Sequence, residues 1–160
     1  YTGILVQDAA FMVTVPFFCP DVPHLKKNPV FLYSSDGFTK PYPFDPDIVV
    51  SLDSIFPKKV EALTALVSQA FEGGAGGSRE RMALVPPASD PQARYEWLYQ
   101  RWARRQGNEA NKFREQLIRL YGIDVGNKVK FAEAFEICEY GSRPTTQQLK
   151  ELFPFLPQAK

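Results

Sequence analysis

The sequence predicts an α/β fold with a mainly parallel sheet. Residues 29–33 and 47–52 are two short apolar runs, rich in β-branched side chains and without alternating polar positions, a pattern typical of strands covered on both faces. Stretches with helical periodicity precede and follow these runs. With 160 residues, 44% of them hydrophobic and 23% charged, the chain is long enough to bury one hydrophobic core.

A helix is expected at the start of the chain, with Thr2 as its cap. Its apolar positions recur at helical spacing: Leu5, Ala9, Met12 and Val13. Because this pattern begins almost at the first residue and no initiator Met is present, we expect the chain to be the trailing part of a longer one. Residues 15–29 should form a loop, since their four prolines exclude a helix interior.

The strand expected at 29–33 and the strand expected at 47–52 are separated by a loop rich in proline and aromatic residues. We expect the two strands to be neighbours or near neighbours, with a helix over residues 54–72 packed on them. Asp53 or Ser54 would cap this helix, and Pro57 is tolerated in its first turn. One face carries its core residues: Val60, Leu63, Val67 and Phe71.

A glycine-rich segment, residues 73–78, then interrupts the helical pattern. It lacks the lysine of a phosphate-binding P-loop and follows a helix instead of a strand, so we interpret it as the start of a flexible break near residues 73–89. From Asp90 and Pro91 the helical pattern resumes and continues to Gly122. This predicts one long helix, or two helices joined near residues 106–108.

Residues 128–140 allow two interpretations. If the run is extended, alternate residues share one face and Glu133 lies between Phe131 and Phe135, where a carboxylate must be either paired or functional. If the run is helical, Phe131, Phe135 and Cys138 form the stripe and Glu133 is exposed. A short helix over residues 147–153 and a proline-rich tail complete the expected elements.

The composition excludes several classes of function. A formal net charge of +1 gives no general reason for a polyanionic partner, so nucleic acid is unlikely as a ligand. There is no run of 18 apolar residues, and hence no membrane span. The single histidine, His24, and the isolated Cys19 and Cys138 form neither a metal motif nor a catalytic triad. A cytoplasmic location is slightly favoured, although an exported protein without its leader would look the same.

One helical segment has the composition of a binding surface. Between residues 94 and 105 arginines alternate with aromatic residues: Arg94, Tyr95, Trp97, Tyr99, Arg101, Trp102, Arg104 and Arg105. Arginine with aromatics is what phosphate attraction and base stacking require. The same pattern also fits an ordinary helix whose aromatics enter the core while its arginines face water. A non-enzymatic binding module that uses the helix at 91–121 for nucleic acid or a protein partner is therefore our alternative function.

Ten short segments together cover nearly the whole chain, although each is weak alone. They are DAAFM at 8–12, the proline-rich loop at 15–23, NPVFLY at 28–33, PYPF at 41–44, PDIVV at 46–50, KKVEAL at 58–63, SQ at 68–69, AEAFE at 132–136, EYG at 139–141 and LFPF at 152–155. In this order they resemble the carboxy-terminal portion of the PIG-L (LmbE-like) family of metal-dependent N-deacetylases.

The resemblance implies a Rossmann-like three-layer sandwich, incomplete in this chain, with residues 1–160 forming the carboxy-terminal part of one LmbE-like domain. It implies a zinc-dependent hydrolase that removes acetyl groups from N-acetylglucosamine-type sugars or glycoconjugates. The family's His-Pro-Asp-Asp and His-x-x-His motifs are not in this sequence. We therefore assign no catalytic residue and no metal ligand, and we expect this chain alone to hold no zinc and to hydrolyse nothing. The missing amino-terminal segment, or another copy of the chain, is the expected partner.

What the resemblance does transfer is the location of a pocket. In open α/β sheets ligands bind beyond the carboxyl ends of the strands, which makes Tyr33, Ser34 and Asp36 substrate-pocket candidates. Glu133, in the AEAFE match, is the fourth candidate. Thr2 and Gly3 should lie next to the absent His-x-x-His segment.

Overall fold

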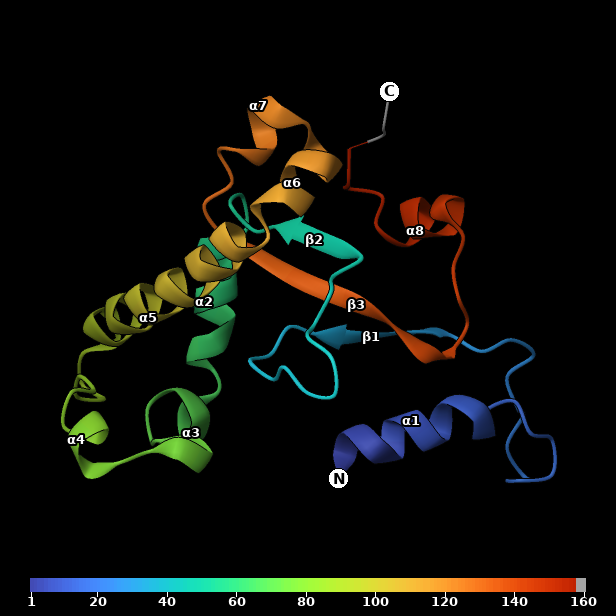
Figure 1. The fold of residues 1–160 in the computed structure, drawn as a ribbon. Helices are drawn as coiled ribbons and strands as arrows, with labels where there is room; N and C mark the ends of the chain where they lie inside the picture. Colours follow the sequence, from blue (N-terminus) through green and yellow to red (C-terminus); the bar gives the residue numbers. More distant parts are fainter. Residues whose placement is uncertain (158–160) are drawn as a thin grey trace. The chain divides into compact units, whose positions relative to one another are not determined.

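A computed structural model describes residues 1–157, which contain both helices and strands (Figure 1). The mixed α/β composition is therefore confirmed. The elements are α1 (Thr2–Met12), β1 (Val30–Ser34), β2 (Ile48–Ser51), α2 (Phe56–Thr64), α3 (Val67–Ala70), the 3-10 helix η1 (Gly74–Gly76), α4 (Arg79–Met82), α5 (Pro91–Lys112), α6 (Arg114–Tyr121), α7 (Ile123–Gly126), β3 (Ala132–Gly141) and α8 (Thr146–Leu152). They divide into two compact units: unit 1 comprises residues 1–49 and the chain from Ala134 onward, and unit 2 comprises Val50–Glu133.

The three strands form one sheet in the order β1-β3-β2. β1 is antiparallel to β3, with Ser34 opposite Phe135. β2 also runs opposite to β3: the Leu52 amide donates to the Phe131 carbonyl at 2.8 Å, whereas towards the other end the Ile137 amide donates to the Asp47 carboxylate at 2.7 Å. The expected strands are thus near neighbours, but the prediction of a mainly parallel sheet is wrong for them. A continuous apolar run indicates burial, and it does not fix the direction of the adjacent strand.

The helix expected over residues 54–72 is two helices, α2 and α3, separated at Ala65 and Leu66. Neither Asp53 nor Ser54 caps α2, which begins after Ile55. The Asp53 carboxylate instead accepts the backbone amides of Lys130 at 3.0 Å and Phe131 at 2.8 Å. The prediction that Asp53 or Ser54 caps the helix is therefore wrong. The Asp53 carboxylate binds two backbone amides that lie 77 and 78 residues further along the chain.

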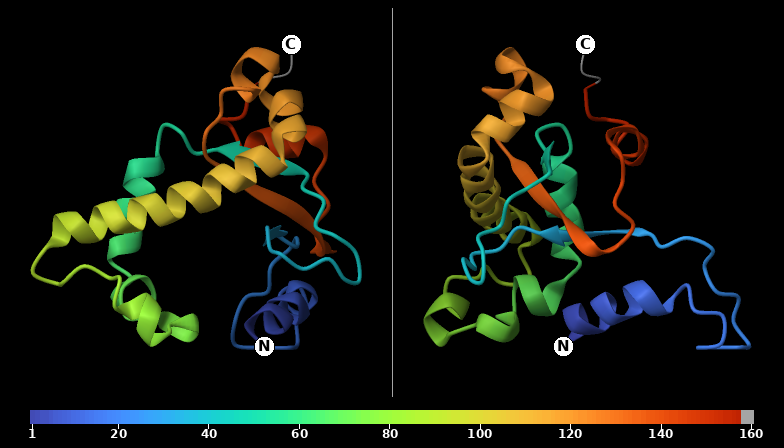
Figure 2. Two further views of the ribbon diagram at one scale, coloured as in Figure 1. Left: turned by 60° about the vertical axis from the view of Figure 1, so that its left-hand side comes forward. Right: turned by 45° about the vertical axis from the view of Figure 1, so that its right-hand side comes forward.

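The core of unit 2 lies between α2 and α5, which cross each other in the left view of Figure 2. The core is made of Leu52, Phe56, Val60, Phe71 and Leu98. Between the two helices the glycine-rich segment makes a tight turn: Gly73 has a φ of 90°, and a Cβ on it would come within 2.9 Å of the Gly77 Cα. Ser78 then caps the short helix α4.

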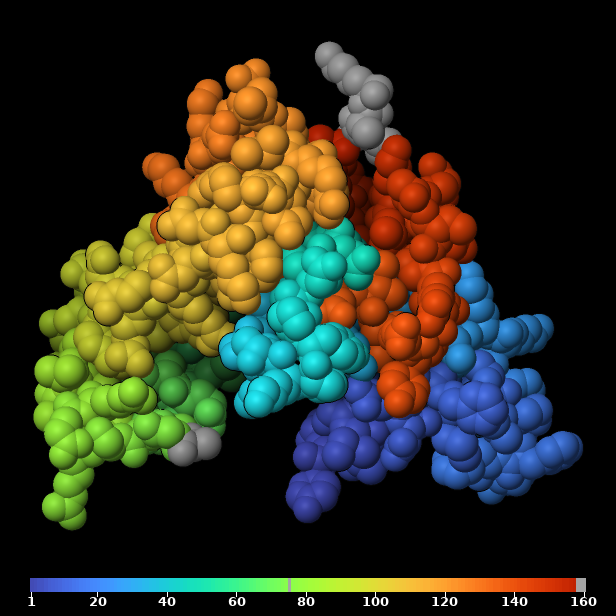
Figure 3. All heavy atoms as spheres, in the orientation of Figure 1, coloured from blue at the N-terminus to red at the C-terminus, as the bar shows by residue number. Residues whose placement is uncertain are grey.

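The helix expected from Asp90 starts as predicted, because the Asp90 carboxylate accepts the Ala93 amide at 2.9 Å and Pro91 follows it. The chain forms two helices, but the junction lies at Phe113 and not near residues 106–108. Gly107 stays helical, and a Cβ on it would make only an ordinary contact, at 3.7 Å, with the Lys130 carbonyl oxygen. Gly122 ends α6 with a φ of 80°, as expected for a terminal glycine. Figure 3 shows α5 and α6 as one continuous surface.

Unit 1 contains the elements at the two ends of the chain. β3 confirms the extended interpretation for residues 132–140, whereas residues 128–131 lie outside the strand. Ala134 and Cys138 are buried while Phe135 and Ile137 are only half-buried, so the core face is opposite to the one expected. Tyr1, and not Thr2, precedes α1, and it makes no side-chain cap. Thr145 and Gln148 cap α8 reciprocally. Within residues 1–157 there is no helix with both the length and the apolar character of a membrane span.

Candidate functional site

Tyr33 is the best-defined member of the predicted pocket, and it lies in unit 1 near the end of β1. Its hydroxyl oxygen accepts two hydrogen bonds, from the Gln7 amide of α1 at 2.6 Å and from the Cys138 thiol of β3 at 3.0 Å. Burial, together with the Cys138 contact, raises the pKa of Tyr33 to about 12. Gln7 and Cys138 thus hold the Tyr33 hydroxyl between α1 and β3.

Ser34 and Asp36 follow Tyr33 along the chain. Ser34 is exposed at the last position of β1. The Asp36 carboxylate accepts the Phe38 amide at 2.9 Å, and this local bond shapes the loop after the strand. The structure therefore places three of the four predicted pocket residues at one strand end of unit 1, whereas Glu133 is the last residue of unit 2.

Glu133 forms an ion pair with Lys59 of α2. The Lys59 ammonium also lies 5.5 Å from the ring centre of Trp102. The neighbouring Phe131 stacks on Phe56 with ring centres 4.0 Å apart. The sequence therefore predicted correctly that a carboxylate beside these rings must be paired or functional, but nothing in the pattern identified Lys59 as the partner. The role of Glu133 towards a substrate stays a prediction.

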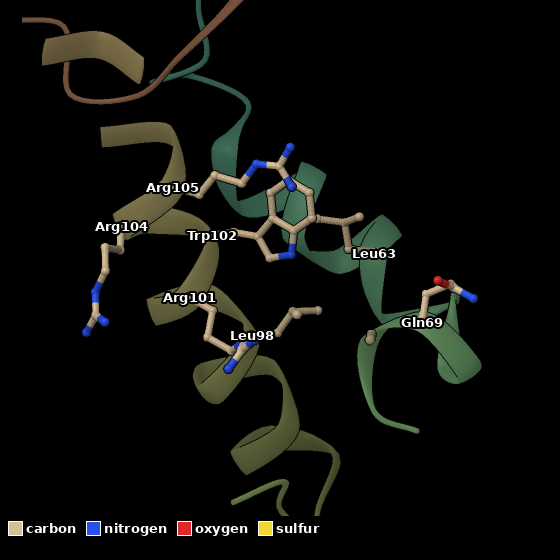
Figure 4. Close-up of a pocket in the computed structure, with 8 residues that line it drawn as sticks. Leu63, Gln69, Leu98, Arg101, Trp102, Arg104 and Arg105 are labelled. Atoms are coloured by element: carbon tan, nitrogen blue, oxygen red, sulfur yellow. The ribbon is translucent and has the colours of Figure 1, made fainter. Parts of the chain in front are cut away.

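A hollow lies in unit 2, between α5 and the α2–α3 segment (Figure 4). It has a volume of about 460 Å³. Trp102 projects from α5 towards Leu63 of α2, and the Arg105 guanidinium lies 5.0 Å from the centre of the Trp102 ring. Most of the remaining lining comes from Leu98, Arg101 and Arg104 of α5 and from Gln69 of α3.

The aromatic residues of this region belong to the core. Tyr95, Trp97, Tyr99 and Trp102 are half-buried and pack against the core of unit 2. Tyr99 makes an edge contact with Phe56 at 5.0 Å, and Trp97 lies 6.2 Å from Phe71. The interpretation of the segment as an ordinary helix is thus confirmed for its aromatic half. The arginines remain at the surface.

Another hollow, in unit 1, was not predicted. It has a volume of about 520 Å³ and is lined largely by apolar residues of α1 and the following loop, among them Leu5, Met12, Phe18 and Leu25. Cys19 and His24 also border it. Sequence analysis missed it because the proline-rich loop carries no periodic pattern that would show which side chains face α1.

The described residues do not fit a zinc site. Among residues 1–157, no group of three or more His, Cys, Asp or Glu side chains is arranged to hold a metal ion. Cys19 is exposed and Cys138 is buried, both as free thiols. We therefore derive no chemical step through a metal from the residues of this chain.

Comparisons with known proteins do not identify a family or a function for this chain. The chain matches no family model, no curated protein and no solved structure. The likeness to the PIG-L family therefore rests on the ten short segments alone.

Proposed function

We propose that this chain is the carboxy-terminal part of a Rossmann-like, zinc-dependent N-deacetylase of the PIG-L type. The intact enzyme would hydrolyse the amide of an N-acetylglucosamine-type sugar or glycoconjugate: water adds to the carbonyl, the C–N bond breaks, and acetate and the free amine leave. The ten segments that resemble the family, which follow one another in the same order along nearly the whole chain, support this assignment.

One observation carries the proposal. If the resemblance holds, α1 and the end of β1 border the same pocket. The segment with the missing zinc ligand would precede α1, and the pocket loop follows β1. Gln7 of α1 donates a hydrogen bond of 2.6 Å to Tyr33 of β1, 26 residues away. This contact does not depend on the resemblance, and it brings together the two segments that the proposal places at the pocket.

The surface of α1 also supports a larger domain. Leu5 is 65% exposed and Phe11 is 68% exposed, and Ala10 is the one fully buried residue of this helix. Exposing the apolar face of a helix to water costs free energy unless another segment covers that face. In the proposal, the upstream segment covers this face and supplies the zinc ligands that the described residues lack.

Within this pocket the residues of the chain would bind and orient the sugar. The Tyr33 hydroxyl, held by Gln7 and Cys138, would form a hydrogen bond with a substrate hydroxyl. Ser34 is exposed beside it and can donate and accept. Neither residue would carry the hydrolysis itself. The proposal therefore assigns these residues to recognition.

The test compares the 160-residue chain with the same chain preceded by its upstream coding segment. We expect the longer protein to hold ~1 equivalent of zinc by elemental analysis and to release acetate from N-acetylglucosamine, while the 160-residue chain does neither. The matched control replaces both histidines of the upstream His-x-x-His segment by alanine, which should remove zinc and activity together. An upstream segment without the two histidine motifs, or tight stoichiometric zinc on the 160-residue chain, would contradict the proposal.

The alternative, a binding module that uses α5 on nucleic acid, is less well supported. Base stacking needs free ring faces, but Trp97 and Trp102 are half-buried against the core and already covered by the guanidinium groups of Arg101 and Arg105. The deacetylase is therefore the function that we put forward.

A further inference from the structure

The loop that follows α1 folds back and closes on itself. The Leu25 amide donates to the Val13 carbonyl at 2.8 Å, so the two ends of the segment at residues 13–25 are joined. Inside this segment the Val22 amide donates to the Cys19 carbonyl at 3.0 Å and makes a turn, and prolines fix further backbone angles. A surface loop with joined ends has the form of an Ω-loop, a type that frequently carries function. The loop therefore provides a wall that exists before any ligand binds.

The hollow between α1 and this loop is largely apolar. Its volume of about 520 Å³ lies in the range of ~300–1,000 Å³ that is usual for small-molecule sites. Leu5, Ala9 and Met12 recur at helical spacing on one face of α1 and line the hollow. Phe18 and Val22 line it from the loop, and both are more than half exposed. An apolar occupant would remove these side chains from water, so the hollow favours one.

One carboxylate lies among these apolar side chains. Asp8 is on the same face of α1, between Leu5 and Met12, and it lines the hollow. Within residues 1–157 its carboxylate forms no ion pair and accepts no hydrogen bond. No lysine or arginine of the described chain lines the hollow, whose other polar residues are Cys19 and His24. With histidine neutral the wall is therefore negative, which favours a cationic group on the occupant and disfavours a second carboxylate.

We propose that this hollow binds a small cationic amphiphile, that is, a molecule with an apolar chain and one ammonium group. The chain lies between α1 and the loop, and the ammonium group donates to the Asp8 carboxylate. A neutral His24 imidazole can accept a further N–H bond from the same group. The site is separate from the proposed deacetylase pocket, because Gln7, which bonds to Tyr33, does not line this hollow. Either proposal can fail without the other.

The experiment titrates the 160-residue chain with octylammonium, with octan-1-ol as the uncharged match and octanoate as the anionic match. Calorimetry measures the affinities, and two-dimensional NMR identifies the backbone amides that shift. Octylammonium should bind with a Kd of ~0.1–1 mM, which is ~5-fold or more tighter than octan-1-ol, and octanoate should bind most weakly. The amides of α1 and of residues 13–25 should shift, whereas those of unit 2 should not.

The length of the chain tests the apolar part of the site. Hexylammonium keeps the charge and lacks two methylene groups, so it should bind ~5–15-fold more weakly than octylammonium. Ala9→Phe places a ring in the hollow and should weaken octylammonium and octan-1-ol alike, by ~10-fold or more. Far-UV circular dichroism and the melting temperature confirm that the variant is folded, so that lost binding is not lost structure.

A second substitution tests the charge. Asp8→Asn keeps the shape and should weaken octylammonium by ~5-fold, while the affinity for octan-1-ol stays within ~2-fold. The matched control is Asp21→Asn, an exposed carboxylate of the same loop that does not line the hollow, and it should change either affinity by less than ~2-fold.

Several results would overturn the proposal. Octan-1-ol or octanoate could bind as tightly as octylammonium, or octylammonium could show no saturable binding up to ~10 mM. An Asp21→Asn variant that loses as much affinity as Asp8→Asn would reduce the effect to general surface charge. Amide shifts confined to unit 2, or unchanged binding by a folded Ala9→Phe variant, would place the ligand elsewhere.

Discussion

The two compact units of the chain bury their large apolar side chains to different extents. In unit 2, Phe56, Val60 and Leu117 are completely buried, and the aromatics of α5 pack on the same core. In unit 1, large apolar side chains of α1 and the loop that follows it are exposed, including Phe11 and Phe17. Both regions nevertheless carry apolar residues of the kind that forms cores. The comparison shows that an apolar stripe indicates a face to be covered, and it does not say by which segment.

The largest expected effect tests this contrast directly. Phe56→Ala removes the stacking with Phe131 and the edge contact with Tyr99 and should lower the free energy of unfolding by ~3–5 kcal/mol. Phe11→Ala, the matched change on α1, should cost less than ~0.5 kcal/mol in the 160-residue chain. Chemical denaturation monitored by circular dichroism measures both. If the two substitutions cost the same, α1 is covered in solution and the contrast between the units is wrong.

A smaller effect on stability is expected at the ion pair between Lys59 of α2 and Glu133, the last residue of unit 2. The side chains of Lys59 and Glu133 are 21% and 35% exposed, so water screens much of their attraction. Glu133→Gln keeps the shape and removes the charge, and we expect it to lower the free energy of unfolding by ~0.5–1 kcal/mol. A double-mutant cycle with Lys59→Met isolates the part that belongs to the pair.

The same variant separates a structural role of Glu133 from a role in substrate binding. In the longer, zinc-loaded protein, the kcat/KM of Glu133→Gln per folded molecule should stay within ~2-fold of the original. A loss of ~10–100-fold with unchanged stability would instead support the substrate-pocket role that the sequence suggested.

The smallest effect is a pH dependence in unit 1, at Tyr33. An unfolded tyrosine loses its proton near pH 10, whereas burial and the Cys138 contact raise the pKa of Tyr33 to about 12 in the folded chain. The unfolded state therefore ionises first, so the contribution of Tyr33 to stability is complete below pH 10 and is lost as the pH rises towards 12. Melting temperatures between pH 9 and 12 should fall less steeply for Tyr33→Phe. Identical slopes would mean that Tyr33 ionises as freely as an exposed tyrosine.

The sequence predicted the elements better than it predicted their partners. Asp90 with Pro91 and the terminal Gly122 marked the limits of the α5–α6 segment because capping is a local interaction. Both expected strands are present within a residue or two of their predicted ends. The partners of Asp53 and Glu133, however, lie 77 and 74 residues away in the sequence. No local pattern contains that information.

The candidate sites follow the same rule. Tyr33, Ser34 and Asp36 could be grouped from the sequence because they are consecutive or nearly so. The pairing of Tyr33 with Gln7 and Cys138 could not be predicted, because it depends on how α1 and β3 pack against β1. The arginines of α5 were visible as a cluster, but only the structure shows that Arg101 stacks on the Trp97 ring and Arg105 on the Trp102 ring.

The position of β3 in the middle of the sheet also determines the order in which the protein can form on the ribosome. Unit 2 is one continuous segment, and it is complete once residue 133 has been synthesised. β1 is made about a hundred residues before β3, its partner in the sheet, which corresponds to a delay of ~5–20 s at ordinary translation rates. During that interval the backbone of β1 has no strand to pair with, so the nascent chain presents an open edge to chaperones and to neighbouring chains.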